Sequence, residues 1–264
     1  KVTVVEALDR IVPTMDGEIA AEFMKSLQKQ GMEFKLSHKV ISAKSSSKNI
    51  EVTMEAIKDK KQIKDKFDIV LMAIGRKPNT ENLNLEKIGI KLNDQKAIVI
   101  DKKFKSSVDN IYAIGDVVPG PMLAHKAEEE GIACVEIIKG QKTHVNYENI
   151  PAIVYTNPEV ASVGKTEEQI KKSNIEYKVG KFPFMANGRA LTTSASEGFV
   201  KILVDKKTDS ILGAHIIGHD AGQLIAEIVT TMEFGGSAED IARICHAHPT
   251  TSEAVKEAAL SVDG

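Results

Sequence analysis

The chain opens with Lys1-Val2-Thr3-Val4-Val5-Glu6, and this stretch decides the type of fold. Val2, Val4 and Val5 put apolar side chains on both faces of a strand, which is typical of a parallel sheet covered by helices on each side. Such a strand needs neighbouring strands, so we expect an α/β fold and interpret the chain as the C-terminal portion of a longer protein. Because the chain is expected to begin inside a domain, its first residues tell us nothing about a targeting segment.

The hydrophobic pattern of the residues that follow this strand predicts a first domain at residues 1–78. A helix from about Asp16 to Gln30 should end at Gly31. We predict strands at 33–36, 39–44 and 49–56, and a solvated, lysine-rich hairpin turn at 58–66. The run Phe67–Arg76 is predicted to be a fully buried strand ending in glycine, and the punctuation at 77–80 indicates a domain boundary.

Two further domains are predicted at residues 79–148 and 149–264. The first centres on Asn110–Asp116, another predicted buried strand that ends in glycine, followed by a helix at 123–139. In the second, short strands precede three helices, which is typical of an α+β domain with an antiparallel sheet. The predicted strands are 152–156, 160–163, 177–183, 198–205 and 210–218, and the predicted helices are 221–234, 238–246 and 252–262.

The composition excludes several classes of protein. The chain of 264 residues is 42% hydrophobic and 27% charged with a net charge of −2, as in an ordinary globular protein of about two domains. Its only cysteines, Cys134 and Cys245, cannot form a disulfide framework and match no zinc pattern, which favours a reducing compartment. The near-neutral charge argues against nucleic acid, and no apolar run reaches the length of a membrane span. We therefore expect no nucleic-acid or membrane partner.

Two acidic residues follow predicted strands and are candidates for binding sugar hydroxyls. Glu6 stands where a dinucleotide-binding unit places the carboxylate that contacts the adenine ribose. Asp116 follows Gly115 at the corresponding end of its strand, just before a helix whose positive end favours an electron-rich ring. The competing interpretation is that Glu6 is a solvated strand end and Asp116 a cap.

The segment Cys245–Glu253 (CHAHPTTSE) offers a general base. His248 precedes a proline and is therefore held in an extended conformation, and Glu253 in the next helix can reach its ring. A carboxylate on one ring nitrogen fixes the tautomer and raises the basicity of the other. Alternatively, Glu253 forms a capping box with Thr250. Metal binding is disfavoured because Cys245, His246 and His248 leave a fourth ligand position empty, so we expect no metal.

Taken together, these residues resemble those of the flavin-dependent pyridine nucleotide–disulfide oxidoreductases, and of the dihydrolipoyl dehydrogenase branch in particular. The resemblance implies an enzyme that reoxidises protein-bound dihydrolipoamide and passes electrons through a redox-active disulfide and FAD to NAD⁺. It covers essentially the whole chain, and its strongest segments are Tyr112–Asp116, Met122–Gly131, Tyr155–Val160, Val179–Phe184 and His246–Thr250.

The resemblance also implies roles for individual residues and domains. His248 would be the general base for the dithiol, and Glu253 would orient it. Residues 1–78 would be a partial NAD-binding domain, 79–148 a central segment contacting FAD, and 149–264 the dimerisation domain. The implied cofactor-binding residues are Asp116, Met122, Leu123, Ala124 and His125 for FAD, and Glu6, Val40 and Gly75 for NAD.

Partners follow from the same resemblance. In this family the histidine of one subunit serves the disulfide of the other, so we expect a homodimer that works with lipoyl domains and core subunits of 2-oxoacid dehydrogenase complexes. The location would be the bacterial cytoplasm or the mitochondrial matrix. The family's CxxxxC pair and glycine loops do not occur in residues 1–264, so the chain alone should be inactive. The alternatives are a glutathione- or mercuric-reductase-like flavoprotein and a non-catalytic dimerisation or docking module.

Overall fold

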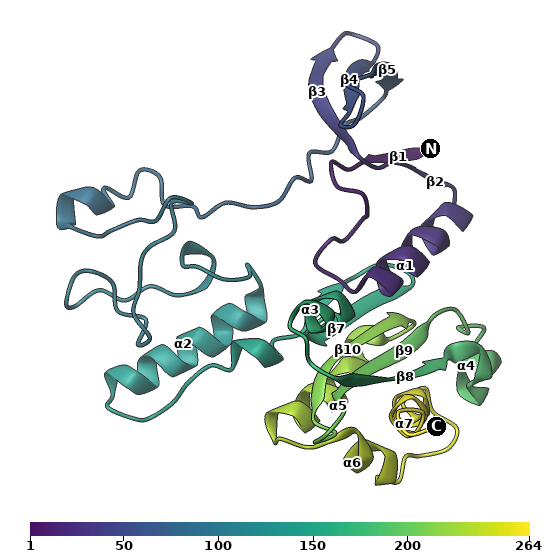
Figure 1. Cartoon of the computed structure of the whole chain (residues 1–264). Helices are drawn as coiled ribbons and strands as arrows, with labels where there is room; N and C mark the ends of the chain where they lie inside the picture. Colours follow the sequence, from purple (N-terminus) through teal and green to yellow (C-terminus); the bar gives the residue numbers. More distant parts are fainter. The chain divides into compact units, whose positions relative to one another are not determined.

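The computed structural model describes residues 1–264 as two compact units. Unit 1 combines residues 1–70 with 148–264, and unit 2 comprises residues 71–147 (Figure 1). Each unit is described by itself. The predicted three-domain division at 78/79 and 148/149 stays a prediction.

The N-terminal part of unit 1 contains a parallel strand pair and a separate antiparallel sheet. Strand β1 (Val2–Val5) pairs with β2 (Met32–Lys35), and α1 (Gly17–Lys29) connects them. Asp16 caps α1 by accepting the Glu18 N–H, 3.1 Å away. The antiparallel sheet has the order β3-β4-β5, formed by β3 (His38–Ser45), β4 (Ile50–Ala56) and β5 (Gln62–Phe67).

The C-terminal part of unit 1 is built on an antiparallel sheet of order β6-β7-β10-β9-β8. Helices cover both of its faces (Figure 1). The strands are β6 (Ala152–Val154), β7 (Glu159–Gly164), β8 (Tyr177–Pro183), β9 (Phe199–Asp205) and β10 (Ile211–Gly218). The helices are α3 (Glu167–Lys172), α4 (Gly188–Thr192), α5 (Ala221–Glu233), α6 (Ala238–Arg243) and α7 (Glu253–Leu260), with a 3-10 turn at η4 (Phe184–Ala186). These elements confirm the predicted α+β domain.

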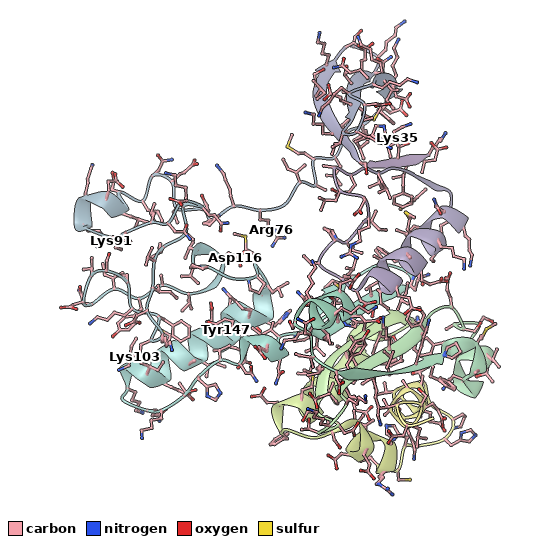
Figure 2. The ribbon with its side chains drawn as sticks, viewed as in Figure 1. Lys35, Arg76, Lys91, Lys103, Asp116 and Tyr147 are labelled. Atoms are coloured by element: carbon pink, nitrogen blue, oxygen red, sulfur yellow. The ribbon has the colours of Figure 1, made fainter.

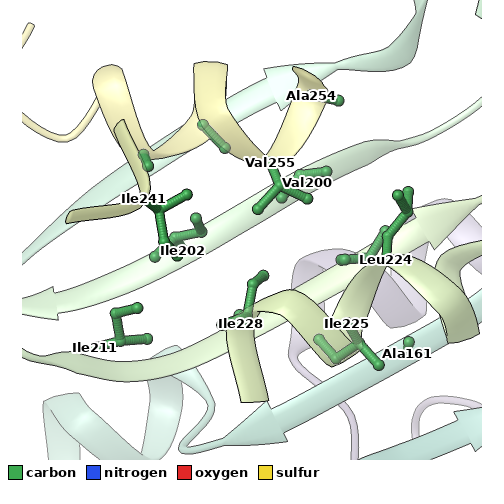
Figure 3. Packing of buried hydrophobic residues seen from close by; sticks show 14 of the residues in the cluster. Ala161, Val200, Ile202, Ile211, Leu224, Ile225, Ile228, Ile241, Ala254 and Val255 are labelled. Atoms are coloured by element: carbon green, nitrogen blue, oxygen red, sulfur yellow. The ribbon is translucent and has the colours of Figure 1, made fainter. Parts of the chain in front are cut away.

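Two apolar layers hold this sheet. On one face, Ile225 and Ile228 of α5 and Val255 of α7 pack against strand residues such as Ile202 (Figure 3). On the other face, Phe23 of α1 belongs to a cluster with residues of β7, β9 and β10. Burying each such side chain contributes about 1.5–3 kcal/mol, so the middle of α5 and the first turn of α7 are held firmly to the sheet.

Unit 2 has one long helix and otherwise short turns. The helix is α2 (Ala124–Ile138), and the 3-10 turns are η1 (Leu85–Ile88) and η2 (Gly115–Val117), with η3 (Tyr147–Asn149) following. One small core gathers around Ala113 and Val118, and another around Phe104 and Cys134. Cys134 is buried in this second core, and burial raises the pKa of its thiol.

Several predicted strands are wrong. Residues 68–76 are not a buried strand, because Ile69, Leu71 and Ile74 are 83%, 85% and 87% exposed. Residues 110–116 form only an isolated bridge at Tyr112 before η2 begins. The strand predicted at the start of the chain is confirmed as β1 in a parallel pair, but β2 is its only partner and it is not fully buried. In each case the apolar run lacks the neighbouring strands that a parallel sheet requires.

One turn prediction is also wrong. The lysine-rich stretch 58–66 is only partly a turn, because β5 begins at Gln62 and pairs with β4. Lys64, Asp65 and Lys66 are exposed on this edge strand, and Ile63 and Phe67 are half-buried. Separately, none of the helices combines the length and the apolar character needed to span a bilayer.

Candidate active site

The structure brings His248 and Glu253 together in unit 1. His248 lies in the segment between α6 and α7, and Glu253 is the first residue of α7. The ring Nδ1 lies 2.8 Å from Glu253 Oε1, so Nδ1–H donates to the carboxylate and the neutral ring carries its lone pair on Nε2. The His248 side chain is 78% exposed, against 24% for Glu253. A proton acceptor is therefore presented at the surface by a carboxylate that is mostly covered.

Glu253 contacts His248, but the capping box that the sequence left open is only half formed. Its second oxygen, Oε2, accepts the backbone N–H of Thr250 at 2.8 Å, which is the glutamate half of a capping box. The other half is absent, because Thr250 Oγ1 donates to the carbonyl of Ala247 at 2.7 Å. The Thr250 N–H, followed by the His248 ring, lowers the pKa of the Glu253 carboxyl. The carboxylate is thus held both ionised and in a fixed orientation.

A second histidine–glutamate pair, which the sequence analysis missed, anchors the same segment. His246 Nε2 lies 2.6 Å from Glu227 Oε1 of α5, and its Nδ1 lies 3.0 Å from the carbonyl oxygen of Ile244. The His246 side chain is only 6% exposed. Both ring nitrogens face oxygen atoms, so this imidazole is held at two points and offers no free nitrogen for chemistry.

Backbone carbonyls along the segment are also tied to neighbouring elements. Lys256 Nζ of α7 donates to Ile244 O at 3.0 Å, and Asn187 Nδ2, at the start of α4, donates to Thr250 O at 3.0 Å. Asn187 is itself buried and caps α4 through the Ala190 N–H. Helices α4, α5 and α7 therefore fix the path of the chain on either side of His248.

The residues expected to contact FAD lie together in unit 2. Asp116 is exposed, makes no hydrogen bond within the chain, and precedes the start of α2 (Figure 2). The N-cap residue of α2 is Leu123, whose side chain forms no cap hydrogen bond. Gly115 has φ +71°, and a Cβ there would lie 3.2 Å from Ala127 Cβ. An exposed carboxylate beside the positive end of a helix fits a ligand with hydroxyl groups and an electron-rich ring.

The residues expected to contact NAD are divided between the two units. In unit 1, the Glu6 carbonyl accepts the His38 N–H at the start of β3, and Val40 of β3 is 52% exposed. Glu6 Oε1 accepts the Leu8 N–H at 2.8 Å, so this carboxylate also stabilises the turn after β1. Gly75 belongs to unit 2, where it is exposed with φ +104°. Glu6 and Val40 thus share one edge of unit 1.

No group of three or more His, Cys, Asp or Glu side chains is arranged to hold a metal ion. Cys245, beside the His246–His248 segment, is exposed and unpaired. Its Sγ is 4.0 Å from the carbonyl oxygen of His246.

Comparisons with known proteins identify the family of the chain. Residues 1–131 match the family model described as pyridine nucleotide-disulphide oxidoreductase, and residues 150–259 match the dimerisation domain of that family. The HOCl-induced flavoprotein disulfide reductase from Escherichia coli superposes with a TM-score of 0.90 at 28% identity, covering 99% of this chain and 59% of that one. The chain belongs to the pyridine nucleotide–disulphide oxidoreductase family.

Within the family, the curated relatives point to one branch. The chain is 53% identical over 261 residues to the mitochondrial dihydrolipoyl dehydrogenase of Pisum sativum, covering 99% of this chain and 52% of that relative. It is also 53% identical over 262 residues to the mitochondrial dihydrolipoyl dehydrogenase of Sus scrofa, covering 98% and 52% respectively. The chain thus spans about half the length of the curated relatives it matches.

Proposed function

We propose that this chain supplies the general base and parts of the FAD and NAD sites of a dihydrolipoyl dehydrogenase, which reoxidises protein-bound dihydrolipoamide with NAD⁺. The observation that carries the proposal is the pair His248–Glu253, with Nδ1 held at 2.8 Å and the ring exposed. The curated relatives at 50–55% identity include several dihydrolipoyl dehydrogenases, so we favour this branch over glutathione- or mercuric-reductase-like enzymes and over a docking module.

The chemistry requires a proton acceptor. A thiolate, rather than a thiol, attacks a disulfide, so His248 Nε2 takes the proton from one thiol of dihydrolipoamide. The proton leaves the ring positively charged, and the Glu253 carboxylate then stabilises that charge across the Nδ1–H hydrogen bond. Glu253 keeps its own orientation during this step because Thr250 N–H holds its second oxygen.

The cofactor residues support the remaining steps. Asp116 would accept hydrogen bonds from the ribityl hydroxyls of FAD, and Leu123, Ala124 and His125 at the start of α2 would lie near the flavin ring, with Met122 alongside. When bound, FAD supplies the two-electron relay between the thiol pair and NAD⁺. Glu6, Val40 and Gly75 would line the NAD site, where the Glu6 carboxylate suits a ribose with a free 2′-hydroxyl.

Partners and location follow from the comparisons. Residues 150–259 match the family's dimerisation domain, which supports a homodimer in which His248 serves the disulfide of the other subunit. The substrate would be the lipoyl domain of a 2-oxoacid dehydrogenase complex, with the core subunits of that complex as partners. The relatives named above are mitochondrial proteins, and we infer the same location for this one.

The test is His248→Gln in the full-length protein that contains this chain. Loss of a general base lowers the rate about 10²-fold or more, so we expect kcat for dihydrolipoamide oxidation by NAD⁺ to fall by at least that factor. The matched control is His219→Gln, since His219 is also an exposed histidine but lies at the end of β10. Equal turnover by the two variants would disprove the assignment of His248.

A further inference from the structure

We infer that Lys126 and Glu130, a buried ion pair on α2, are positioning residues that hold Asp116 in place for FAD. This inference rests on the proposed function, in which Asp116 binds the ribityl chain. It adds two buried charged residues that act through the backbone of Gly115.

Both side chains of the pair contact the backbone of one glycine, Gly115. Lys126 and Glu130 are one helical turn apart on α2, both side chains are 0% exposed, and Nζ lies 3.1 Å from Oε1. Lys126 Nζ donates to the Gly115 carbonyl at 3.0 Å, and Glu130 Oε2 accepts the Gly115 N–H at 2.6 Å. Both backbone polar groups of Gly115 are therefore bound to the same ion pair.

The pair is also satisfied from its other side. Tyr147, labelled with Asp116 in Figure 2, donates its hydroxyl proton to Glu130 Oε1 at 2.7 Å. Burial, followed by this hydrogen bond, raises the pKa of Tyr147 well above its ordinary value, so the donor stays protonated. Glu130 thus accepts three hydrogen bonds from Lys126, Tyr147 and the Gly115 backbone.

Stability alone does not account for this arrangement. Removing two charges from water is costly, and apolar replacements of buried pairs are often neutral or stabilising. A buried pair that binds one peptide at both ends instead fixes the position of that peptide. Gly115 has φ +71° and packs against Ala127, and Asp116 is the next residue of the same 3-10 turn. We call the ion pair of Lys126 and Glu130, together with its hydrogen bonds to Gly115, the clamp. The clamp holds the start of η2 against the first two turns of α2.

Locking these two elements sets the flavin-side geometry. In the proposed function the exposed Asp116 carboxylate and the start of α2 contact the same ligand, and binding groups need placement to within about 0.5 Å. Asp116 has no side-chain partner of its own to hold it. The position of Asp116 therefore depends on its neighbour Gly115, whose backbone is held by Lys126 and Glu130.

The test replaces both charges at once in the full-length protein, as Lys126→Met with Glu130→Leu. We expect the double variant to bind FAD roughly tenfold or more weakly, the scale of a lost hydrogen bond to a charged group. Because the double variant leaves the buried N–H and carbonyl of Gly115 without their partners, we also expect the melting temperature of the flavin-free protein to fall. FAD affinity is measured by flavin fluorescence after removal and titration of the cofactor, and Glu128→Gln, exposed on the same helix, is the control.

A double-mutant cycle with Asp116→Asn tests whether Lys126 and Glu130 affect FAD binding through Asp116. If the clamp acts through Asp116, this substitution weakens FAD binding in the wild type but adds little in the double variant. Fully additive losses, or unchanged FAD affinity in the double variant, would overturn the inference.

A second measurement covers failure to fold and failure of the proposed function. Glu130→Gln keeps the shape of the side chain, and we expect faster amide hydrogen exchange at Gly115 and Asp116 than in the wild type, measured without cofactor. Unchanged exchange at these amides would refute the clamp. If the wild-type protein binds no FAD, the proposed function fails, and the exchange result still decides whether Lys126 and Glu130 fix Gly115.

Discussion

The two ring nitrogens of His248 have different surroundings, and this difference defines its chemistry. Nδ1 is committed to Glu253, whereas the exposed ring leaves Nε2 for a substrate proton. His246, two residues earlier, has both nitrogens committed and is buried. We therefore propose a chemical role for His248 and an anchoring role for His246, although both belong to the same short segment.

Glu253→Gln separates the orienting role from the capping role. The amide can still accept one hydrogen bond through its oxygen, but it cannot accept from both Thr250 N–H and His248 Nδ1–H. We expect kcat of the full-length protein to fall about tenfold or more, as for a lost charge-assisted hydrogen bond, with KM for dihydrolipoamide little changed. Steady-state kinetics measure both values. Glu257→Gln, an exposed position on α7, should leave both unchanged, and a Glu253 variant that behaves like it would refute the orienting role.

His246→Leu tests the anchor. The substitution leaves the Glu227 carboxylate and part of the Ile244 carbonyl without their partner, so the free energy of unfolding should fall by about 1–3 kcal/mol. Denaturant titration measures it. His219→Leu, at an exposed histidine, should change stability by about 0.5 kcal/mol or less. If the two variants unfold alike, His246 is no anchor.

The sequence exposes only part of this site. His248 and Glu253 are five residues apart across a proline and a helix start, so local spacing was enough to predict their contact. Glu227 lies 19 residues before His246 on another helix, and no local rule connects them. The buried network of Lys126, Glu130 and Gly115 was missed for a different reason, since an i,i+4 ion pair on a helix normally indicates a solvated face.

At the level of elements, predictions held where a strand or helix is defined by its own pattern. The predicted strand at 177–183 and helix at 221–234 agree with β8 and α5 to within one residue. The apolar runs at 67–76 and 110–116 failed because a parallel strand depends on neighbours that are distant in sequence. Without paired strands, Ile69 and Leu71 remain exposed.

The close packing of β8 against α7 matters for the site, because α7 carries Glu253. A Cβ on Gly180 would lie 2.0 Å from the Ala258 carbonyl oxygen and 2.7 Å from a methyl group of Val262. We expect Gly180→Ala to push α7 away from the sheet and to reduce the free energy of unfolding by about 1–3 kcal/mol. Gly188→Ala is the control, because nothing lies within 4 Å of a Cβ at that position in α4. Equal melting temperatures for the two variants would contradict this packing.

At the scale of the whole unit, one buried lysine joins the two chain segments of unit 1. Lys201 of β9 is 1% exposed, and its Nζ contacts Asp16 Oδ1 at 3.0 Å and Glu167 Oε2 at 2.7 Å. Asp16 caps α1 in the first segment, whereas Glu167 begins α3 in the second. The same Asp16 carboxylate accepts the Glu167 N–H at 3.0 Å.

This network predicts loss of stability in acid. Burial opposes ionisation of Glu167, but hydrogen bonds from Lys171 and Lys201 lower its pKa from 4.5 to about 2. A lowered carboxyl pKa contributes stability that is complete above the unfolded value and is lost as the pH falls toward the folded value. We therefore expect the melting temperature to drop between pH 4.5 and about 2, and to drop less steeply in Glu167→Gln. Glu176→Gln, at an exposed carboxylate, should retain the wild-type slope.

Because unit 1 is assembled from residues 1–70 and 148–264, the chain leaves it once and returns once. The exposed stretch 69–74 lies where it leaves, and such a stretch is open to a protease. Cleavage there would sever the only covalent route between α1 and the sheet it covers, yet Lys201, Asp16 and the apolar layer around Phe23 would remain in place. A nicked molecule should then migrate as two bands under denaturing conditions and as one particle in gel filtration.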